Sequence, residues 1–278
     1  MKCCLVCYKY GVPLDDPCCY PLGFMYVSSV FKRNGHDVKV LNYNLFDYDF
    51  VAEIKDQDIV LFTGFEEFAT LIVRDAKICK ELGVYTVLGG ALANYLTDTM
   101  LKYVDEVFVG EFPTGVHLDS MPLPDYIGFG IVEYQKRHKN NFMGVLTATG
   151  CPYSCSFCSQ VCKFEMRSLS RVFGEIMLYK LKYDVDTIVF YDNTFNVSKK
   201  RFMKICAWMK GRGLSWSASI RCSPFDEEMA RAAKKSGCIY FVIGVESFTQ
   251  AKLDAMNKQI KVSDIHRTIG LLQKFKIR

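Results

Sequence analysis

Residues 150–158 read Gly-Cys-Pro-Tyr-Ser-Cys-Ser-Phe-Cys and follow directly on an apolar run. Cys151, Cys155 and Cys158 are therefore spaced C-x3-C-x2-C on a tight turn. Three thiolates this close in sequence can ligate three irons of a 4Fe–4S cluster and leave the fourth iron open to a substrate. The stretch therefore predicts a site of chemistry at the point where a strand passes into a loop.

Two other kinds of site fit part of this pattern. A structural zinc site can use four cysteines, and Cys162 adds a fourth cysteine nearby. Such sites usually combine two short cysteine pairs across a longer loop, whereas this chain has a single group. A redox pair of Cys155 and Cys158 is the second alternative, but it leaves Cys151 without a role. The spacing favours the iron–sulfur site, with Cys162 as a bystander, and both alternatives stay open.

The composition indicates a globular protein in a reducing compartment. Half of the 278 residues are hydrophobic and 23% are charged, and the net charge of +5 gives no indication of a nucleic-acid partner. The chain has no apolar run of membrane-spanning length, and its first residues do not resemble a signal peptide. Thirteen cysteines, an odd number, do not fit a secreted disulfide framework. We therefore expect a cytoplasmic protein without a membrane partner.

The first part of the chain alternates short apolar runs with helical patterns. We expect strands at residues 5–7, 37–41, 58–64, 84–88 and 106–109, and helices at 22–33, up to about 82, and at 92–103. Apolar strands that alternate with helices predict a doubly wound parallel sheet. The periodicity fades where Pro122 and Pro124 favour extended backbone. We therefore predict a domain over residues 1–115 and a linker over residues 116–141.

A second alternating series fills the predicted domain of residues 142–278. We expect its strands at residues 144–147, 187–191, 216–220 and 240–245, and its helices at 170–183, 199–212, 226–236, 249–256 and from 263 onward. Strands recur roughly every thirty to forty residues, as successive βα units require. This series predicts a second parallel sheet of βα units.

Residues 143–260 resemble the radical S-adenosylmethionine superfamily. The cysteine spacing, with the aromatic Phe157 before the last cysteine, matches the hallmark of the family. Further matches follow in the family's order, at residues 190–195, 216–221, 243–247 and 256–258. The resemblance implies an α/β fold with a βα barrel, a 4Fe–4S cluster on Cys151, Cys155 and Cys158, and S-adenosylmethionine chelated to the open iron.

The same resemblance implies which side chains contact S-adenosylmethionine. These residues are Phe157, Asp192, Asn193, Arg221, Gly244, Glu246 and Ser247. Asp192 and Asn193 would accept from the ligand's ammonium, and Arg221 would pair with its carboxylate. Glu246 and Ser247 would hold the ribose hydroxyls or the amino group, and Gly244 would allow close backbone approach. Each residue also has an ordinary structural alternative, such as a helix cap, a turn or a surface ion pair.

The amino-terminal part resembles the cobalamin-binding domain that precedes the barrel in one subgroup of this family. The matches lie at residues 21–26, 34–40, 87–90, 109–111 and 121–125. A doubly wound sheet binds ligands at the carboxyl ends of its strands. The resemblance therefore places the candidate cobalamin contacts at Gly64, Gly89, Gly90, Gly110 and Glu111. Because the D-x-H-x-x-G pattern is absent, we expect no lower histidine ligand, and cobalamin binding itself stays open.

The family barrel usually has six βα units, and this chain stops at Arg278 after the fourth. We therefore expect a partial, apparently truncated barrel. The chain is then a naturally short member, a fragment, or a protein whose barrel a partner completes. An oligomer or partner covering the strand at residues 240–245 would protect its open edge.

These predictions combine into a leading hypothesis and its alternatives. The leading hypothesis is an enzyme that cleaves S-adenosylmethionine reductively, with electrons from a flavodoxin- or ferredoxin-type donor and a substrate that the sequence does not identify. With cobalamin, methyl transfer to an unactivated carbon or phosphorus is expected; without it, hydrogen abstraction and rearrangement. The alternatives are a non-catalytic or partner-completed iron–sulfur or cobalamin-binding protein, and a zinc-binding protein.

Overall fold

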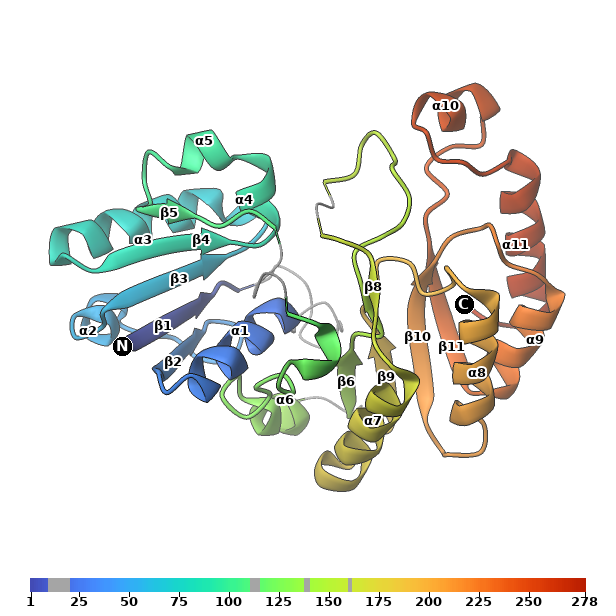
Figure 1. The fold of residues 1–278 in the computed structure, drawn as a ribbon, viewed down its shortest axis with the longest axis horizontal. Helices are drawn as coiled ribbons and strands as arrows, with labels where there is room; N and C mark the ends of the chain where they lie inside the picture. Colours follow the sequence, from blue (N-terminus) through green and yellow to red (C-terminus); the bar gives the residue numbers. More distant parts are fainter. Residues whose placement is uncertain (10–20, 111–115, 138–140, 160–161) are drawn as a thin grey trace. The chain divides into compact units, whose positions relative to one another are not determined.

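A computed structural model describes residues 1–9, 21–110, 116–137, 141–159 and 162–278 of the chain (Figure 1). The chain divides into two compact units, Met1–Lys139 (unit 1) and Asn140–Arg278 (unit 2). Each unit is built on its own parallel sheet. None of the helices in the described ranges has the length and apolarity that crossing a bilayer requires.

The sheet of unit 1 has five parallel strands in the order β2-β1-β3-β4-β5. The strands are β1 (Lys2–Cys7), β2 (Asp37–Asn42), β3 (Ile59–Thr63), β4 (Tyr85–Gly89) and β5 (Glu106–Val107). All residues of β1 after Lys2 are buried, as expected of a strand covered on both faces. The strand order reverses between β1 and β3, and the predicted doubly wound fold is confirmed.

The helices of unit 1 follow the predicted pattern only in part. They are α1 (Leu22–Arg33), α2 (Phe50–Ile54), α3 (Ala69–Leu82), α4 (Ala91–Tyr95), α5 (Thr97–Met100) and α6 (Ile131–Arg137). The single helix predicted over residues 92–103 is therefore two short helices. The Thr97 hydroxyl donates to the Ala93 carbonyl at 2.5 Å, at the point where α4 ends, so the side chain competes with the backbone there.

The segment predicted as a linker packs onto unit 1. Asp125 accepts hydrogen bonds from Ser28 and Lys32 of α1, both at 2.6 Å. The Ser29 hydroxyl donates to the Leu123 carbonyl at 2.6 Å. The contacts of this proline-containing segment thus assign it to the first unit, and α6 lies within it. The prolines in the sequence indicate extended backbone but not what that backbone packs against.

The main sheet of unit 2 has four parallel strands in the order β11-β10-β9-β6. The strands are β6 (Phe142–Val145), β9 (Thr187–Phe190), β10 (Ser215–Ile220) and β11 (Cys238–Ile243). Each new strand lies beside the one before it, so the sheet grows in one direction as a βα barrel requires. The predicted α/β class, a doubly wound sheet followed by a barrel-type βα series, is confirmed.

Helices follow each strand of this sheet. They are α7 (Leu169–Tyr183), α8 (Lys199–Met209), α9 (Glu227–Lys235), α10 (Gln250–Ala255) and α11 (Val262–Phe275). In Figure 1, α8, α9 and α11 gather on one side of the sheet, and α9 packs against both of the others. Beyond α11, Arg278 bonds to β11: its carbonyl accepts from Phe241 at 2.8 Å and its amide donates to Ile239 at 3.2 Å. The strand edge predicted to be open is therefore partly paired.

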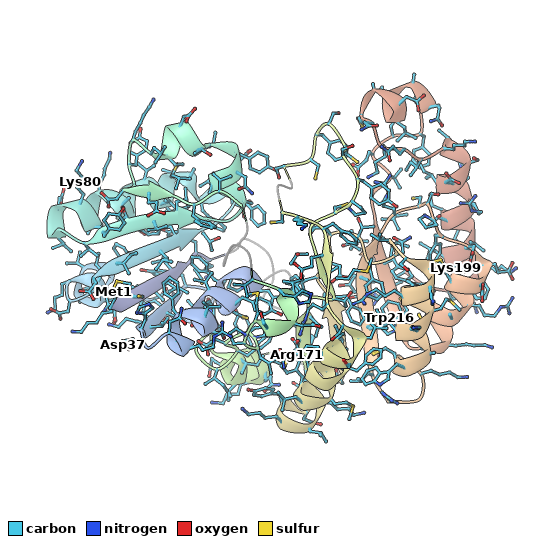
Figure 2. The ribbon with its side chains drawn as sticks, in the orientation of Figure 1. Met1, Asp37, Lys80, Arg171, Lys199 and Trp216 are labelled. Atoms are coloured by element: carbon cyan, nitrogen blue, oxygen red, sulfur yellow. The ribbon has the colours of Figure 1, made fainter. Side chains whose placement is uncertain are left out.

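An aromatic core stabilises unit 2 around Trp216 of β10, which is labelled in Figure 2. The Trp216 side chain is fully buried, and its indole N–H donates to the carbonyl and hydroxyl of Ser236, both at 3.1 Å. The rings of four phenylalanines lie within 5.5–6.1 Å of its ring, namely Phe190, Phe195, Phe202 and Phe241. This core joins β9, β10, β11 and α8.

Substituting Trp216→Ala should lower the free energy of unfolding of unit 2 by about 3–5 kcal/mol, because it opens a large cavity in this core. Denaturant unfolding followed by circular dichroism measures the loss. Trp208→Ala, on the partly exposed surface of α8, is the control and should cost clearly less. Equal losses for the two variants would contradict the central role of Trp216.

Candidate functional site

The three predicted ligand cysteines lie on one loop whose ends are pinned together. We call residues 150–164 the cysteine loop; it runs between β7 (Ala148–Thr149) and β8 (Glu165–Met166), which pair antiparallel. Gly150 has a φ of +63°, and a Cβ there would lie 2.5 Å from the carbonyl oxygens of Cys162 and Lys163. Only glycine fits this close approach. The loop therefore leaves the sheet and returns at one fixed point.

The thiols of this loop differ from most other cysteines of the chain in their access to solvent. Cys151 and Cys155 are partly exposed, Cys158 is exposed, and all three are free thiols. The cysteines outside the loop are buried in the described ranges, and burial raises the pKa of Cys206, for example, to about 12. Buried thiols of this kind stay protonated, whereas metal ligation requires thiolates.

No three His, Cys, Asp or Glu side chains in the described part of the chain lie close enough together to hold a metal ion. The ligand role of Cys151, Cys155 and Cys158 therefore stays a prediction. Their chemistry does fit the group. The three are accessible soft donors on one anchored loop, and none is in a disulfide.

Asp192 holds the strand end from which this loop begins. Its buried carboxylate accepts from the Thr147 amide at 2.6 Å, the Thr147 hydroxyl at 2.5 Å and the Ala148 amide at 3.2 Å. Burial raises the pKa of the Asp192 carboxyl to about 6. The structure thus shows this carboxylate bonded within the chain, and its contact with a ligand ammonium stays a prediction.

The residues after Asp192 reach the cysteine loop. Asn193 is exposed at the end of β9, so its side chain is accessible to a ligand as predicted. The Thr194 hydroxyl donates to the Asn193 carbonyl at 2.8 Å and lies 3.4 Å from the Cys151 sulfur. The sequence prediction missed Thr194, although it stands inside one of the matched segments.

Two arginines hold the backbone just before the cysteine loop. Arg167 donates to the Leu146 carbonyl at 2.8 Å and forms a buried ion pair with Glu175 at 2.6 Å. Arg201 donates to the Thr147 carbonyl at 3.0 Å. Together with Asp192, these side chains form hydrogen bonds with residues 146–148, which directly follow β6.

A segment a hundred residues further along the chain docks on the cysteine loop. The Ser156 amide donates to the Met256 carbonyl at 2.9 Å. The side-chain Nδ2 of Asn257 donates to the Ser154 carbonyl at 2.8 Å and to the Ser154 hydroxyl at 3.0 Å. The segment after α10 therefore stabilises the middle of the loop, a role that the sequence did not predict.

The residues that follow β11 surround a buried lysine. Lys258 forms an ion pair with Glu246 at 2.8 Å, and its ammonium lies 5.6 Å from the centre of the Phe157 ring. A Cβ at Gly244 would lie 2.7 Å from this ammonium, so the glycine leaves room for it. Ser247 instead accepts from the Thr249 amide at 3.0 Å, at the start of α10. Gly244, Glu246 and Phe157 are thus brought together, while Ser247 faces the helix.

Arg221, at the end of β10, also contacts the cysteine loop. Its guanidinium carbon lies 3.6 Å from the centre of the Tyr153 ring, and one guanidinium N–H points to the Cys155 sulfur at 3.7 Å. A second N–H donates to the Lys258 carbonyl. The structure therefore shows the predicted carboxylate partner of S-adenosylmethionine engaged with the loop itself.

The predicted glycines of unit 1 lie at one edge of its sheet. Gly64 directly follows β3, and Gly89 is the last residue of the neighbouring strand β4, in register with Thr63. Gly90 and Gly110 have φ values of +79° and +105°, which favour glycine. A Cβ at Gly89 would meet open space. The remaining predicted residue, Glu111, lies outside the described residues.

Comparisons with known proteins identify relatives of both units. The Radical SAM superfamily model matches residues 145–278, and the B12 binding domain model matches residues 16–117. An uncharacterized methyltransferase of Pyrococcus horikoshii is 28% identical, over 92% of this chain and 67% of that protein. The anaerobic magnesium-protoporphyrin IX monomethyl ester cyclase of Cereibacter sphaeroides is 31% identical, over 58% of this chain and 28% of that protein.

A solved structure with the same fold is the radical S-adenosylmethionine methyltransferase TsrM from Kitasatospora setae, with cobalamin and a [4Fe-4S] cluster bound. The TM-score is 0.76 at 17% identity, over 99% of this chain and 68% of that chain. At this identity the likeness concerns the fold. The chain spans 28–68% of the length of these three proteins.

Asp192 should make the stability of unit 2 depend on pH. Its pKa is raised in the folded state, so protonation stabilises the fold fully below about pH 4, and this contribution is lost as the pH rises through about 6. The difference amounts to about 3 kcal/mol, at 1.36 kcal/mol per pKa unit. Urea unfolding of Asp192→Asn between pH 4 and 7 should lack this dependence. Asp186→Asn, an exposed carboxylate at the other end of β9, should keep it; a wild-type profile without that dependence would contradict the assignment.

Proposed function

Because the chain belongs to the radical SAM superfamily and carries a B12-binding domain, we propose that it is an enzyme of cobalamin-dependent methyl transfer. Both family predictions made from the sequence are confirmed by these matches. A 4Fe–4S cluster and S-adenosylmethionine are the cofactors of the first family, and cobalamin is that of the second. When bound, the cluster supplies an electron for the reductive cleavage of S-adenosylmethionine, and cobalamin supplies a methyl carrier.

The observation that carries this proposal is the anchored cysteine loop. Cys151, Cys155 and Cys158 hold the cluster, because they are the accessible thiols of a loop pinned at both ends and at its middle. Asn193 and Glu246 bind the polar groups of S-adenosylmethionine beside them. Phe157, Gly244 and Ser247 complete the predicted set. Asp192 and Arg221 act as positioning residues, because Asp192 bonds to Thr147, just after β6, and Arg221 bonds to the cysteine loop.

The carboxyl edge of the first sheet is the proposed cobalamin site. Gly89 and Gly110, whose Cβ positions face open space, let a large planar ligand approach the backbone there, and Gly64, Gly90 and Glu111 belong to the same predicted edge. Methyl transfer is favoured because the Pyrococcus horikoshii relative is named a methyltransferase. A flavodoxin- or ferredoxin-type electron donor in a reducing cytoplasm completes the proposal, with residues 1–115 and 142–278 as the two functional domains.

Replacing Cys151, Cys155 and Cys158 together with alanine should abolish iron and sulfide binding, because the cluster then has no protein ligand. Anaerobic reconstitution followed by iron and sulfide analysis measures this, and 5′-deoxyadenosine formation with dithionite should fall with it. Cys162→Ala is the matched control and should retain both. Wild-type iron content in the triple variant would overturn the ligand assignment.

Replacing Gly89 with valine should abolish cobalamin binding while the fold persists, because its Cβ position faces open space. Cobalt content after anaerobic gel filtration with added cobalamin measures binding, and circular dichroism checks the fold. Gly23→Val on α1, another glycine with open space, is the control. Undiminished cobalt in Gly89→Val would place the cobalamin site elsewhere.

A further inference from the structure

The Arg221 side chain is a buried cation that contacts two residues of the cysteine loop, Tyr153 and Cys155. Only 5% of the residue is exposed. Its guanidinium lies over the Tyr153 ring, points one N–H to the Cys155 sulfur and donates another to the Lys258 carbonyl. Its buried Nε–H has no hydrogen-bond partner among the described residues. The guanidinium is thus held in place, and its Nε–H remains free to donate a hydrogen bond.

The backbone of Arg221 is fixed as firmly as its side chain. The fully buried Asn196 accepts from the Arg221 amide at 2.9 Å and donates to the Arg221 carbonyl at 2.9 Å. The same Asn196 amide group also donates to the Pro224 carbonyl at 2.6 Å. Because backbone and guanidinium are both anchored, the positive charge cannot turn away from the loop.

This cation lacks a carboxylate partner. None of the ion pairs formed in the described ranges includes Arg221, and the nearby Glu246 is paired with Lys258. A buried charge is costly unless an opposite charge compensates it. The sulfur of Cys155 lies 3.7 Å away and becomes anionic when it binds a metal. The geometry therefore leaves this thiolate as the natural counter-ion.

We propose that Arg221 is the counter-ion of Cys155 and that its charge makes the bound 4Fe–4S cluster easier to reduce. This inference rests on the proposed function, since it assumes that the cysteine loop holds the cluster. Reduction adds one electron from a low-potential donor to the site and breaks no bond of the chain. A fixed positive charge nearby stabilises that added electron and so raises the midpoint potential.

An arginine suits this position better than a lysine. Its planar guanidinium can stack on Tyr153 while separate N–H groups reach Cys155 and Lys258. Lysine preserves the charge but not this geometry. The pair of substitutions therefore separates the effect of charge from that of shape.

The test compares Arg221→Gln, Arg221→Lys and the wild type after anaerobic reconstitution. Iron and sulfide analysis gives the cluster content, and a redox titration followed by electron paramagnetic resonance gives the midpoint potential. Arg221→Gln should show at least a tenfold lower ratio of reduced to oxidised cluster at a fixed potential, a shift of about 59 mV for one electron. Arg221→Lys should recover most of that shift.

Arg212→Gln is the matched control. The Arg212 guanidinium also lies over an aromatic ring, that of Trp208 at 4.2 Å, and it makes no contact with the described residues of the cysteine loop. This variant should keep the wild-type potential. If Arg221→Gln binds no cluster, its midpoint potential cannot be measured, and Arg221→Lys becomes the test. An Arg221→Lys variant that binds the cluster with a nearly wild-type midpoint potential supports the role of the charge.

Two results would overturn the inference. One is an unchanged potential in a fully loaded Arg221→Gln variant, which leaves the proposed function intact. The other is failure of both Arg221 variants to assemble the cluster, which would make the geometry and not the charge essential. A wild-type protein that takes up no iron and sulfide would instead overturn the proposed function together with this inference.

Discussion

The buried carboxylate of Asp192 joins two neighbouring strands at the point where the cysteine loop begins. It bonds to two consecutive amides and one hydroxyl at residues 147 and 148, beside the paired strands β6 and β9. Together with Arg167 and Arg201, this link sets the direction in which the chain leaves β6. The position of every later residue of the loop, including its three thiols, depends on that direction.

The loop is otherwise held from outside, because it has little regular structure of its own. The β7–β8 pair closes its base, Asn257 binds its middle, and Arg221 and Lys258 contact its aromatic side chains. Arg221 follows β10, whereas Asn257 and Lys258 follow α10. A barrel-type sheet thus brings residues that are distant in sequence together around one loop.

The sequence predicted the periodic parts of this molecule and the chemistry of its cysteines. The helix Leu22–Arg33 was predicted to the residue, since an apolar stripe and the Asn34-Gly35 stop signal define it. The four strands of the second sheet were each predicted to within a few residues. The loop at residues 150–158 could be identified because its three predicted ligands are close together in sequence. Helices α2 and α6 were missed, because both are short and depend on contacts with the rest of unit 1.

The roles of single polar residues were harder to predict than their positions. Asp192 and Arg221 were expected at strand ends and do lie there. Residue type and position do not determine whether such a side chain points to a ligand or to the chain's own backbone. That choice depends on Thr147, Tyr153 and Lys258, which are far away in sequence. For the same reason no local pattern could assign Asn257 to the loop.

The docking of residues 256–258 on the cysteine loop bears on how the protein is made. During translation, Cys158 is added one hundred residues before Lys258. At roughly 5–20 residues per second, the thiols wait about 5–20 s for their anchor. During that interval the nascent loop has only the contacts of residues made earlier, such as Thr194 and Arg221. The loop therefore gains the contacts of residues 256–258 only some time after its thiols have been made.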